Sequence, residues 1–300
     1  MSELDDLKLS QEQLAKYEQV LGLFKKILSD SDLYKLEYLA YQLTDIIEHN
    51  RILLPNGKIG EFVLEVVAKA VNEAWALTGS LFFGAYTSCF HHARAVIEVY
   101  ASLVYVFSKP EKKRKRIKKY YNYHLVYFYK HYKLLHDLFK QDKITEEVFR
   151  HQCLVSDDKF KELEKKVPML AKLYGVKDDE LCKVKNWHHP ALISNLLETA
   201  YNRVLKKSAQ AEDGAVTKGA DLDNLSKIYA EFCEMTHLSP LSGRAVGSSL
   251  MFGYPQVKAG QIKYDDLNRP ISITQIMLTD IILLLEEELK IKIDINLPKI

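Results

Sequence analysis

The chain has 300 residues, of which 47% are hydrophobic and 27% are charged, an ordinary globular composition that excludes a disordered or fibrous protein. Its 42 Lys and Arg against 40 Asp and Glu give a net charge of +2, so the chain as a whole lacks the basic character of a nucleic-acid or membrane binder. This balance conceals a segregation of charge. Residues 109–140 hold 11 basic and two acidic residues, a net charge of +9, whereas the other residues sum to −7.

The cysteines and the two chain ends indicate the compartment. The four cysteines stand far apart in the sequence and lack the Cys-x-x-Cys spacing of a zinc or redox site. Scattered thiols of this kind fit a reducing environment. The first ten residues, MSELDDLKLS, are acidic and polar, unlike a signal peptide. The longest apolar run near the C-terminus, Ile281–Leu285, is far shorter than the roughly 20 residues that a spanning helix needs. We therefore expect a cytoplasmic protein that makes no membrane contact.

Apolar residues recur three and four positions apart in nearly every long segment, which is the period of an amphipathic helix. Polar stretches at 208–220 and 238–268 break this pattern and predict irregular chain. A weak alternation at 290–300 predicts a short strand. The pattern as a whole predicts helices over residues 10–28, 32–49, 59–77, 81–107, 110–139, 145–154, 158–166, 178–183, 191–206, 221–236 and 272–289.

This succession predicts an all-α fold, a multi-helix bundle with long central helices and an irregular segment before the last helix. The turn at 54–57, Leu-Pro-Asn-Gly, predicts a boundary between two parts of the chain. Residues 1–55 would form a helical pair, either an appendage or packed on the body. Residues 56–300 would form the main helical bundle.

Polar residues beside the apolar stripes are the candidate site residues. In the predicted helix 81–107, His91, Arg94 and Glu98 fall on one face, and Arg94 and Glu98 are close enough to pair. One interpretation is an ion pair that fixes the register of the helix, a kind of pair that contributes little net stability when it is buried. The other is a site arginine that Glu98 holds in place.

A second polar run, Trp187, His188 and His189, precedes Pro190 and the predicted start of a helix. Free backbone amides at a helix start attract anions, so these residues are candidate ligand-binding groups. The alternative is a tryptophan anchor with capping histidines.

A third candidate group lies on the predicted helix 221–236. Tyr229, Cys233 and His237 share one of its faces, and Pro240 predicts its end. A histidine at a helix C-terminus is stabilised when it is charged. This raises the basicity of the imidazole, which suits a general acid or base at neutral pH.

The segment Lys109–Lys119 holds eight Lys and Arg in eleven residues and leads directly into a helix rich in tyrosine. Cations beside exposed aromatic rings are typical of proteins that bind single-stranded nucleic acid. The alternative is a solvated basic face on one side of the helix, with the tyrosines packed in the bundle on the other. The candidate nucleic-acid-binding residues are Lys112, Lys113, Arg114, Lys115, Arg116, Lys118 and Lys119.

The order of these motifs resembles a bacterial family of helical proteins catalogued only as a domain of unknown function, over residues 60–245. The resemblance implies that the marked positions are Arg94, Glu98, Trp187, Tyr229 and His237. The chain is similar, more loosely, to HEPN helical bundles, which often belong to toxin–antitoxin and phage-defence systems and include metal-independent ribonucleases with an Arg-x(4–6)-His motif. The nearest match here, Arg116 to His124, has seven intervening residues, so the chain departs from that motif.

These observations lead to three hypotheses. In the first, the protein binds RNA in a bacterial stress or anti-phage system and in one version cleaves it, as a HEPN-like ribonuclease. His237 would then be the general acid or base, Arg94 would stabilise the phosphorane, and Glu98 would orient Arg94, with Tyr229 beside them. The second is a non-catalytic module that binds a partner protein. The third is a nucleotide or small-ligand sensor in which Trp187 stacks on a base. We expect no cofactor and no metal, and a homodimer remains open.

Overall fold

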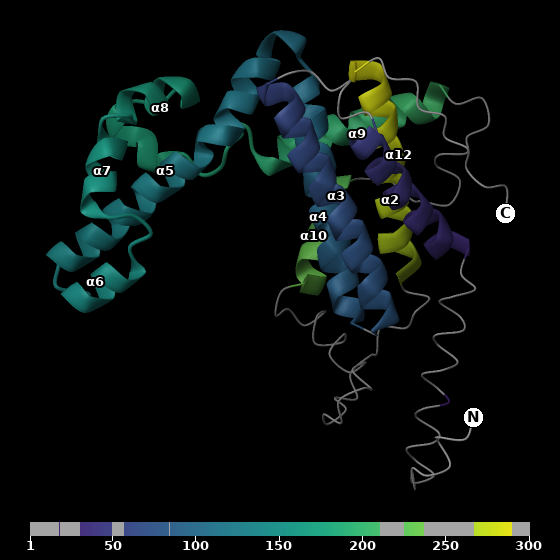
Figure 1. Ribbon diagram of the computed structural model, residues 1–300, viewed down its shortest axis with the longest axis horizontal. Coiled ribbons are helices and arrows are strands. Elements are labelled where there is room, and N and C mark those ends of the chain that lie inside the picture. Colours follow the sequence, from purple (N-terminus) through teal and green to yellow (C-terminus); the bar gives the residue numbers. More distant parts are fainter. Residues whose placement is uncertain are drawn as a thin grey trace, which may run out of the picture. The chain divides into compact units, whose positions relative to one another are not determined.

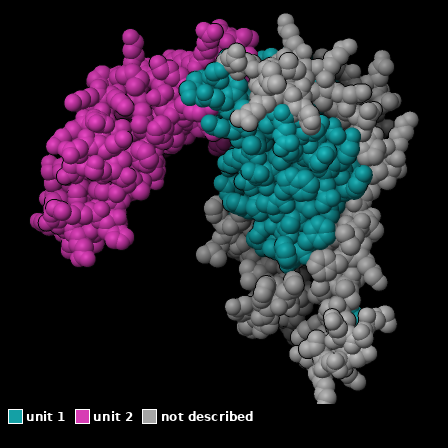
Figure 2. Space-filling model, in the orientation of Figure 1, with its two compact units in different colours: residues 1–105, 197–300 teal, residues 106–196 magenta. Residues whose placement is uncertain are grey.

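The computed structural model of the protein describes residues 18, 31–49, 57–83, 85–210, 225–236 and 267–289. These residues contain helices and no strand, which confirms the predicted all-α bundle (Figure 1). The chain divides into two compact units, unit 1 with residues 1–105 and 197–300 and unit 2 with residues 106–196 (Figure 2). Unit 2 is therefore an insertion in the sequence of unit 1.

The predicted N-terminal pair is described only in its second helix, α2 (Ser31–His49). This helix packs against α3 (Lys58–Phe82) and α12 (Asn268–Leu289), so it belongs to the body of unit 1. Apart from residue 18, the predicted helix 10–28 lies outside the described residues, as does the predicted strand at 290–300. The predicted boundary at 55 and 56 stays a prediction, because residues 50–56 are also outside them.

Unit 1 also contains most of α4 (Tyr86–Phe107) and α9 (Ile193–Gln210), together with α10 (Leu225–Thr236). The predicted break at Gly79 is wrong, because α3 continues to Phe82. A glycine inside a helix costs about 1 kcal/mol. Leu77 and Leu81, on either side of it, are fully buried, and each such burial contributes about 1.5–3 kcal/mol. The helix ends where the amide of Phe83 donates to the Gly79 carbonyl.

Unit 2 is built around α5 (Lys113–Lys140), which follows the short 3-10 helix η1 (Pro110–Lys112). Capping side chains begin two of its short helices. The Thr145 hydroxyl accepts a hydrogen bond from the Val148 amide, and the Ser156 hydroxyl accepts one from the Lys159 amide. A third helix ends at Gly175, whose φ of 75° is the left-handed conformation that glycine adopts freely. The elements that contact α5 are α6 (Glu146–Gln152), α7 (Asp157–Glu164), α8 (Val167–Tyr174) and η2 (Asp178–Lys183).

One face of α5 is buried in the core of unit 2. Val126 and Tyr129 pack with residues of α8 and η2, and Tyr132 and Leu135 pack with Phe149 of α6. The predicted helix 158–166 covered only α7, and α8 was missed because Pro168 interrupts the pattern in the first turn of that helix, where proline is tolerated. None of the described helices is both long enough and apolar enough to cross a membrane.

Candidate functional site

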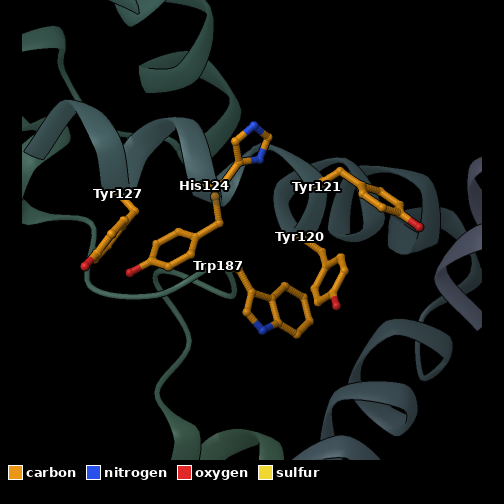
Figure 3. Close-up of a pocket in the computed structure, with 6 residues that line it drawn as sticks. Tyr120, Tyr121, His124, Tyr127 and Trp187 are labelled. Carbon is orange, nitrogen blue, oxygen red and sulfur yellow. The ribbon is translucent and has the colours of Figure 1, made fainter. Parts of the chain in front are cut away.

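An open pocket of about 440 Å³ lies on unit 2, where Trp187 faces α5 (Figure 3). In Figure 3 the indole lies between Tyr120 on one side and Tyr127 on the other. Among the described residues, no carboxylate, lysine or arginine lines this space. Flat rings are suited to stacking on an unsaturated ring of a ligand. The six side chains of this aromatic pocket are Tyr120, Tyr121, Tyr123, His124, Tyr127 and Trp187.

Trp187 is held against α5 because side chains of that helix form hydrogen bonds with backbone carbonyls of the segment 184–189. Lys119, Tyr123 and Lys130 are spaced four and seven residues apart, so their side chains lie on one face of α5. Each donates a hydrogen bond to a backbone carbonyl of the segment. The acceptors are the carbonyl oxygens of His189, Lys185 and Val184, at 2.5, 2.5 and 2.7 Å respectively.

Two further contacts fix the chain around Trp187. The ring of Tyr120 meets the indole of Trp187 at right angles, with 5.5 Å between the ring centroids. His188 is buried, and its Nδ1 donates to the Ala191 carbonyl at 2.8 Å. This hydrogen bond closes the turn before α9, which begins at Ile193, and it is the contact that corresponds to the predicted capping by histidine. Trp187 and His188 were predicted from the sequence as candidate ligand-binding residues. The hydrogen bonds that attach their segment to α5 were not predicted.

Lys119 and Arg116, two of the predicted nucleic-acid contacts, are bound inside unit 2. Each is only 8% exposed. Burial, and then the nearby charges of Lys115 and Arg116, lowers the pKa of Lys119 to about 8. Arg116 donates to the Ser108 hydroxyl at 3.0 Å, and the Tyr174 hydroxyl donates to the Lys119 carbonyl at 2.6 Å. Both side chains are therefore engaged in contacts within unit 2.

The other predicted basic contacts remain at the surface, except Lys113, whose Nζ lies 4.5 Å from the centre of the Phe107 ring. Lys112, Arg114, Lys115 and Lys118 are exposed. At 100° per residue, Lys115 and Lys118 lie roughly 140–160° around α5 from Tyr120, whereas Arg114 lies within about 20° of Tyr121 on the same face of the helix. Lys185, two residues before Trp187, is also exposed, and its carbonyl accepts the hydrogen bond from the pocket residue Tyr123.

Unit 2 nevertheless carries the positive charge of the protein. Residues 106–196 hold 21 Lys and Arg against 12 Asp and Glu, a formal net charge of +9. The remaining chain has a net charge of −7. The pocket therefore lies on the unit that attracts anions most strongly at long range.

We expect unit 2 to lose stability as the pH falls below about 6.5, the ordinary pKa of histidine. Burial, and then the neighbouring Lys119, lowers the pKa of His189, and burial also lowers that of His188. The unfolded chain then binds protons that the folded unit excludes, so protonation favours unfolding. Trp75→Phe leaves Trp187 as the sole tryptophan, and its fluorescence should give a lower urea midpoint at pH 5.5 than at pH 7.5.

His188→Asn is the matched variant, because an amide retains a donor for the Ala191 carbonyl but does not titrate. Its midpoint should change less between the two pH values. An equal change in both proteins would contradict a contribution from His188.

Unit 1 brings together three of the four predicted catalytic residues. Arg94 and Glu98 lie on α4 and Tyr229 on α10. The Arg94 Nε donates to a Glu98 carboxylate oxygen at 3.1 Å, and the Tyr229 hydroxyl donates to the same oxygen at 2.6 Å. The Arg94 guanidinium carbon lies 5.4 Å from the centre of the Tyr229 ring. Glu98 thus contacts both Arg94 and Tyr229, and its role in orienting Arg94 for catalysis stays a prediction.

The chemistry of this group is limited by its contacts. Burial, and then the bond to Glu98, raises the pKa of Tyr229, so its hydroxyl is not a base at neutral pH. Burial of the pair is only partial, with the Glu98 side chain 35% exposed. His237, the predicted acid or base, lies outside the described residues. A catalytic role for Arg94, Glu98 and Tyr229 therefore stays a prediction.

A second polar network in unit 1 was not predicted. Asp280 of α12 is 3% exposed and accepts hydrogen bonds from the Tyr100 hydroxyl and from the Arg203 Nε, both at 2.6 Å. Arg203 also donates to Glu287, which Lys207 contacts as well. The signal was present in the sequence, because Asp280 is the only charged residue between Ile276 and Leu285.

No protein-family model, curated protein or solved structure matches this chain. The resemblance to the uncharacterised helical family and to HEPN bundles therefore stays a prediction. The function has to be argued from the pocket, the charge and the contacts described above.

Proposed function

We propose that the protein binds single-stranded RNA through unit 2, with an unpaired base stacked in the aromatic pocket. The observation that carries the proposal is a pocket on a unit of net charge +9 whose lining, in the described part of the chain, is entirely aromatic. Stacking on aromatic side chains contributes about 1–3 kcal/mol per base. The positive charge attracts the phosphates, whatever the base sequence.

The charge also decides between two classes of ligand that aromatic pockets take. Rings of Tyr and Trp bind quaternary ammonium groups through cation–π contacts. Here no acidic side chain of the described residues lines the pocket, and the surrounding unit repels cations. A base attached to an anionic backbone fits both features, and the exposed Lys185, two residues before Trp187, is a candidate partner for a phosphate.

RNA cleavage, a role in bacterial stress or phage defence, and binding of a partner protein are separate hypotheses. Cleavage depends on His237, and the Arg94 Nε is already bound to Glu98. Incubation of mixed RNA with the wild type and with His237→Ala tests it directly, since equal RNA integrity in both would exclude this histidine as a catalyst.

Fluorescence anisotropy of a labelled 12-nucleotide RNA tests the binding proposal. Trp187→Ala should weaken the affinity roughly 5- to 150-fold, the effect of losing one stacked base. The matched control is Trp75→Ala, which removes the other tryptophan, on unit 1, and should leave the affinity unchanged. Circular dichroism establishes that both variants are folded. A DNA strand and an RNA duplex of the same sequence distinguish a requirement for the 2′-hydroxyl from one for unpaired bases.

Charge variants locate the phosphate contact. Lys185→Glu, two residues before Trp187, should weaken binding more than Lys118→Glu, on the face of α5 opposite Tyr120 and Tyr127. Affinity for the single strand should fall with salt, with a logarithmic slope of about −0.7 for each phosphate contacted. Tight binding that survives Trp187→Ala, or equal binding of duplex and single strand, would contradict the proposal.

A further inference from the structure

A stripe of three aromatic side chains and one leucine, all exposed except the partly buried His131, continues from the pocket along α5. Its members, spaced three and four residues apart, share one face of the helix. Tyr127 is 48% exposed and Leu134 is 60% exposed. The rings of Tyr127 and His131 are stacked, with 6.0 Å between their centroids and 28° between their planes. We call His124, Tyr127, His131 and Leu134 the α5 stripe.

The stripe and the aromatic pocket are continuous, because His124 and Tyr127 belong to both. Figure 3 shows Tyr127 at the edge of the pocket, beyond the indole of Trp187. Successive turns of the helix place neighbouring rings of the stripe about 5.4 Å apart along its axis. A ligand that begins in the pocket and extends along α5 therefore meets a second stacked surface at Tyr127 and His131.

The side chains of the pocket and stripe also limit which features of a base the protein can recognise. They offer ring faces, phenol hydroxyls and ring nitrogens, but no amide and no carboxylate. Bidentate recognition of a base edge relies on Asn, Gln, Arg or acidic side chains. Stacking accepts every base, because each has a π-face. The net charge of +9 on this unit favours a polyanion as the extended ligand.

From these features, and resting on the proposed function, we infer that unit 2 binds at least two consecutive unpaired bases without selecting their sequence. The first base lies in the pocket against Trp187, and the next lies on the stacked pair of Tyr127 and His131. The strand thus follows the axis of α5. The ligand class is a short single-stranded oligonucleotide rather than a mononucleotide.

A length series tests this inference in the full chain carrying Trp75→Phe, where quenching of Trp187 fluorescence reports binding. The probes are uridine oligonucleotides of one, two, four and eight units, with adenosine oligonucleotides as the comparison of base type. Affinity should rise roughly 5- to 150-fold between one and two units, the effect of one more stacked base. The uridine and adenosine series should show the same increase with length.

His131→Ala should remove most of that increase, because it takes away the ring on which Tyr127 stacks. His151→Ala, at an exposed position of α6 in the same unit, is the matched control and should preserve it. The unfolding midpoint of each variant establishes that it folds. Equal affinity for one and for eight units would overturn the extended site, and so would an unchanged dependence of affinity on length in His131→Ala. In either case the proposed function would still stand if binding depended on Trp187. Absence of binding by every oligonucleotide would overturn both.

Discussion

Arg203→Met is expected to lower the free energy of unfolding of unit 1 by roughly 3–5 kcal/mol, because it leaves a buried carboxylate without its charged partner. The Arg203 Nε lies 2.6 Å from an oxygen of Asp280, whose side chain is 4% exposed. The other Asp280 oxygen has no hydrogen-bond partner among the described residues, so nothing there compensates for the lost charge. Urea unfolding followed by Trp75 fluorescence in a Trp187→Phe background measures the effect on this unit.

Glu287→Gln is the matched control for the same network. Glu287 also contacts Arg203, at 2.9 Å, but it is 41% exposed, and exposed ion pairs contribute only about 0–1 kcal/mol. Adding Asp280→Leu to Arg203→Met should recover most of the loss, since no charge then remains buried. If Arg203→Met costs no more than Glu287→Gln, the carboxylate is better solvated than its burial indicates.

Phe232→Ala should destabilise unit 1 by about 3–5 kcal/mol, the usual cost of removing a buried phenyl ring. The ring is fully buried and lies edge-on to Phe90 of α4, with 5.4 Å between the centroids. It anchors α10 to α4, and Tyr229 stands one turn earlier on the same helix. Loss of the anchor should therefore also weaken the hydrogen bond from Tyr229 to Glu98.

The control for this substitution is Ala230→Ser, at an exposed position of α10. Surface changes of this kind stay within about 0.5 kcal/mol. The same Trp75 fluorescence assay compares the two variants. Similar midpoints would mean that α10 contributes little to the core of unit 1.

Helix positions could be predicted from the sequence because each helix repeats its own apolar period, which is local information. The division into units could not, because it depends on contacts such as that of Tyr100 with Asp280, 180 residues apart. The continuation of α3 through Gly79 could not be predicted for the same reason, because it depends on the burial of Leu77 and Leu81, which is a tertiary effect.

The candidate site was predictable only in part, and for similar reasons. Trp187 stood out as an aromatic residue in a polar run, and the spacing of Arg94 and Glu98 gave their contact. The basic run, by contrast, looks uniform along its length. Which of its members is buried depends on a segment 70 residues away, where Lys119 meets the His189 carbonyl.

The insertion of unit 2 within unit 1 sets an order for folding during synthesis. The last residue of unit 2, Leu196, leaves the ribosome more than 90 residues before the end of α12 at Leu289. Domains generally fold as units as the chain emerges, so unit 2 can close while unit 1 still lacks its final helix. Until then Tyr100 and Arg203 have no carboxylate to bind, and the apolar faces of α2 and α3 that α12 covers stay open to solvent. A chain truncated before α12 would thus present the pocket of unit 2 on an incomplete, aggregation-prone unit 1.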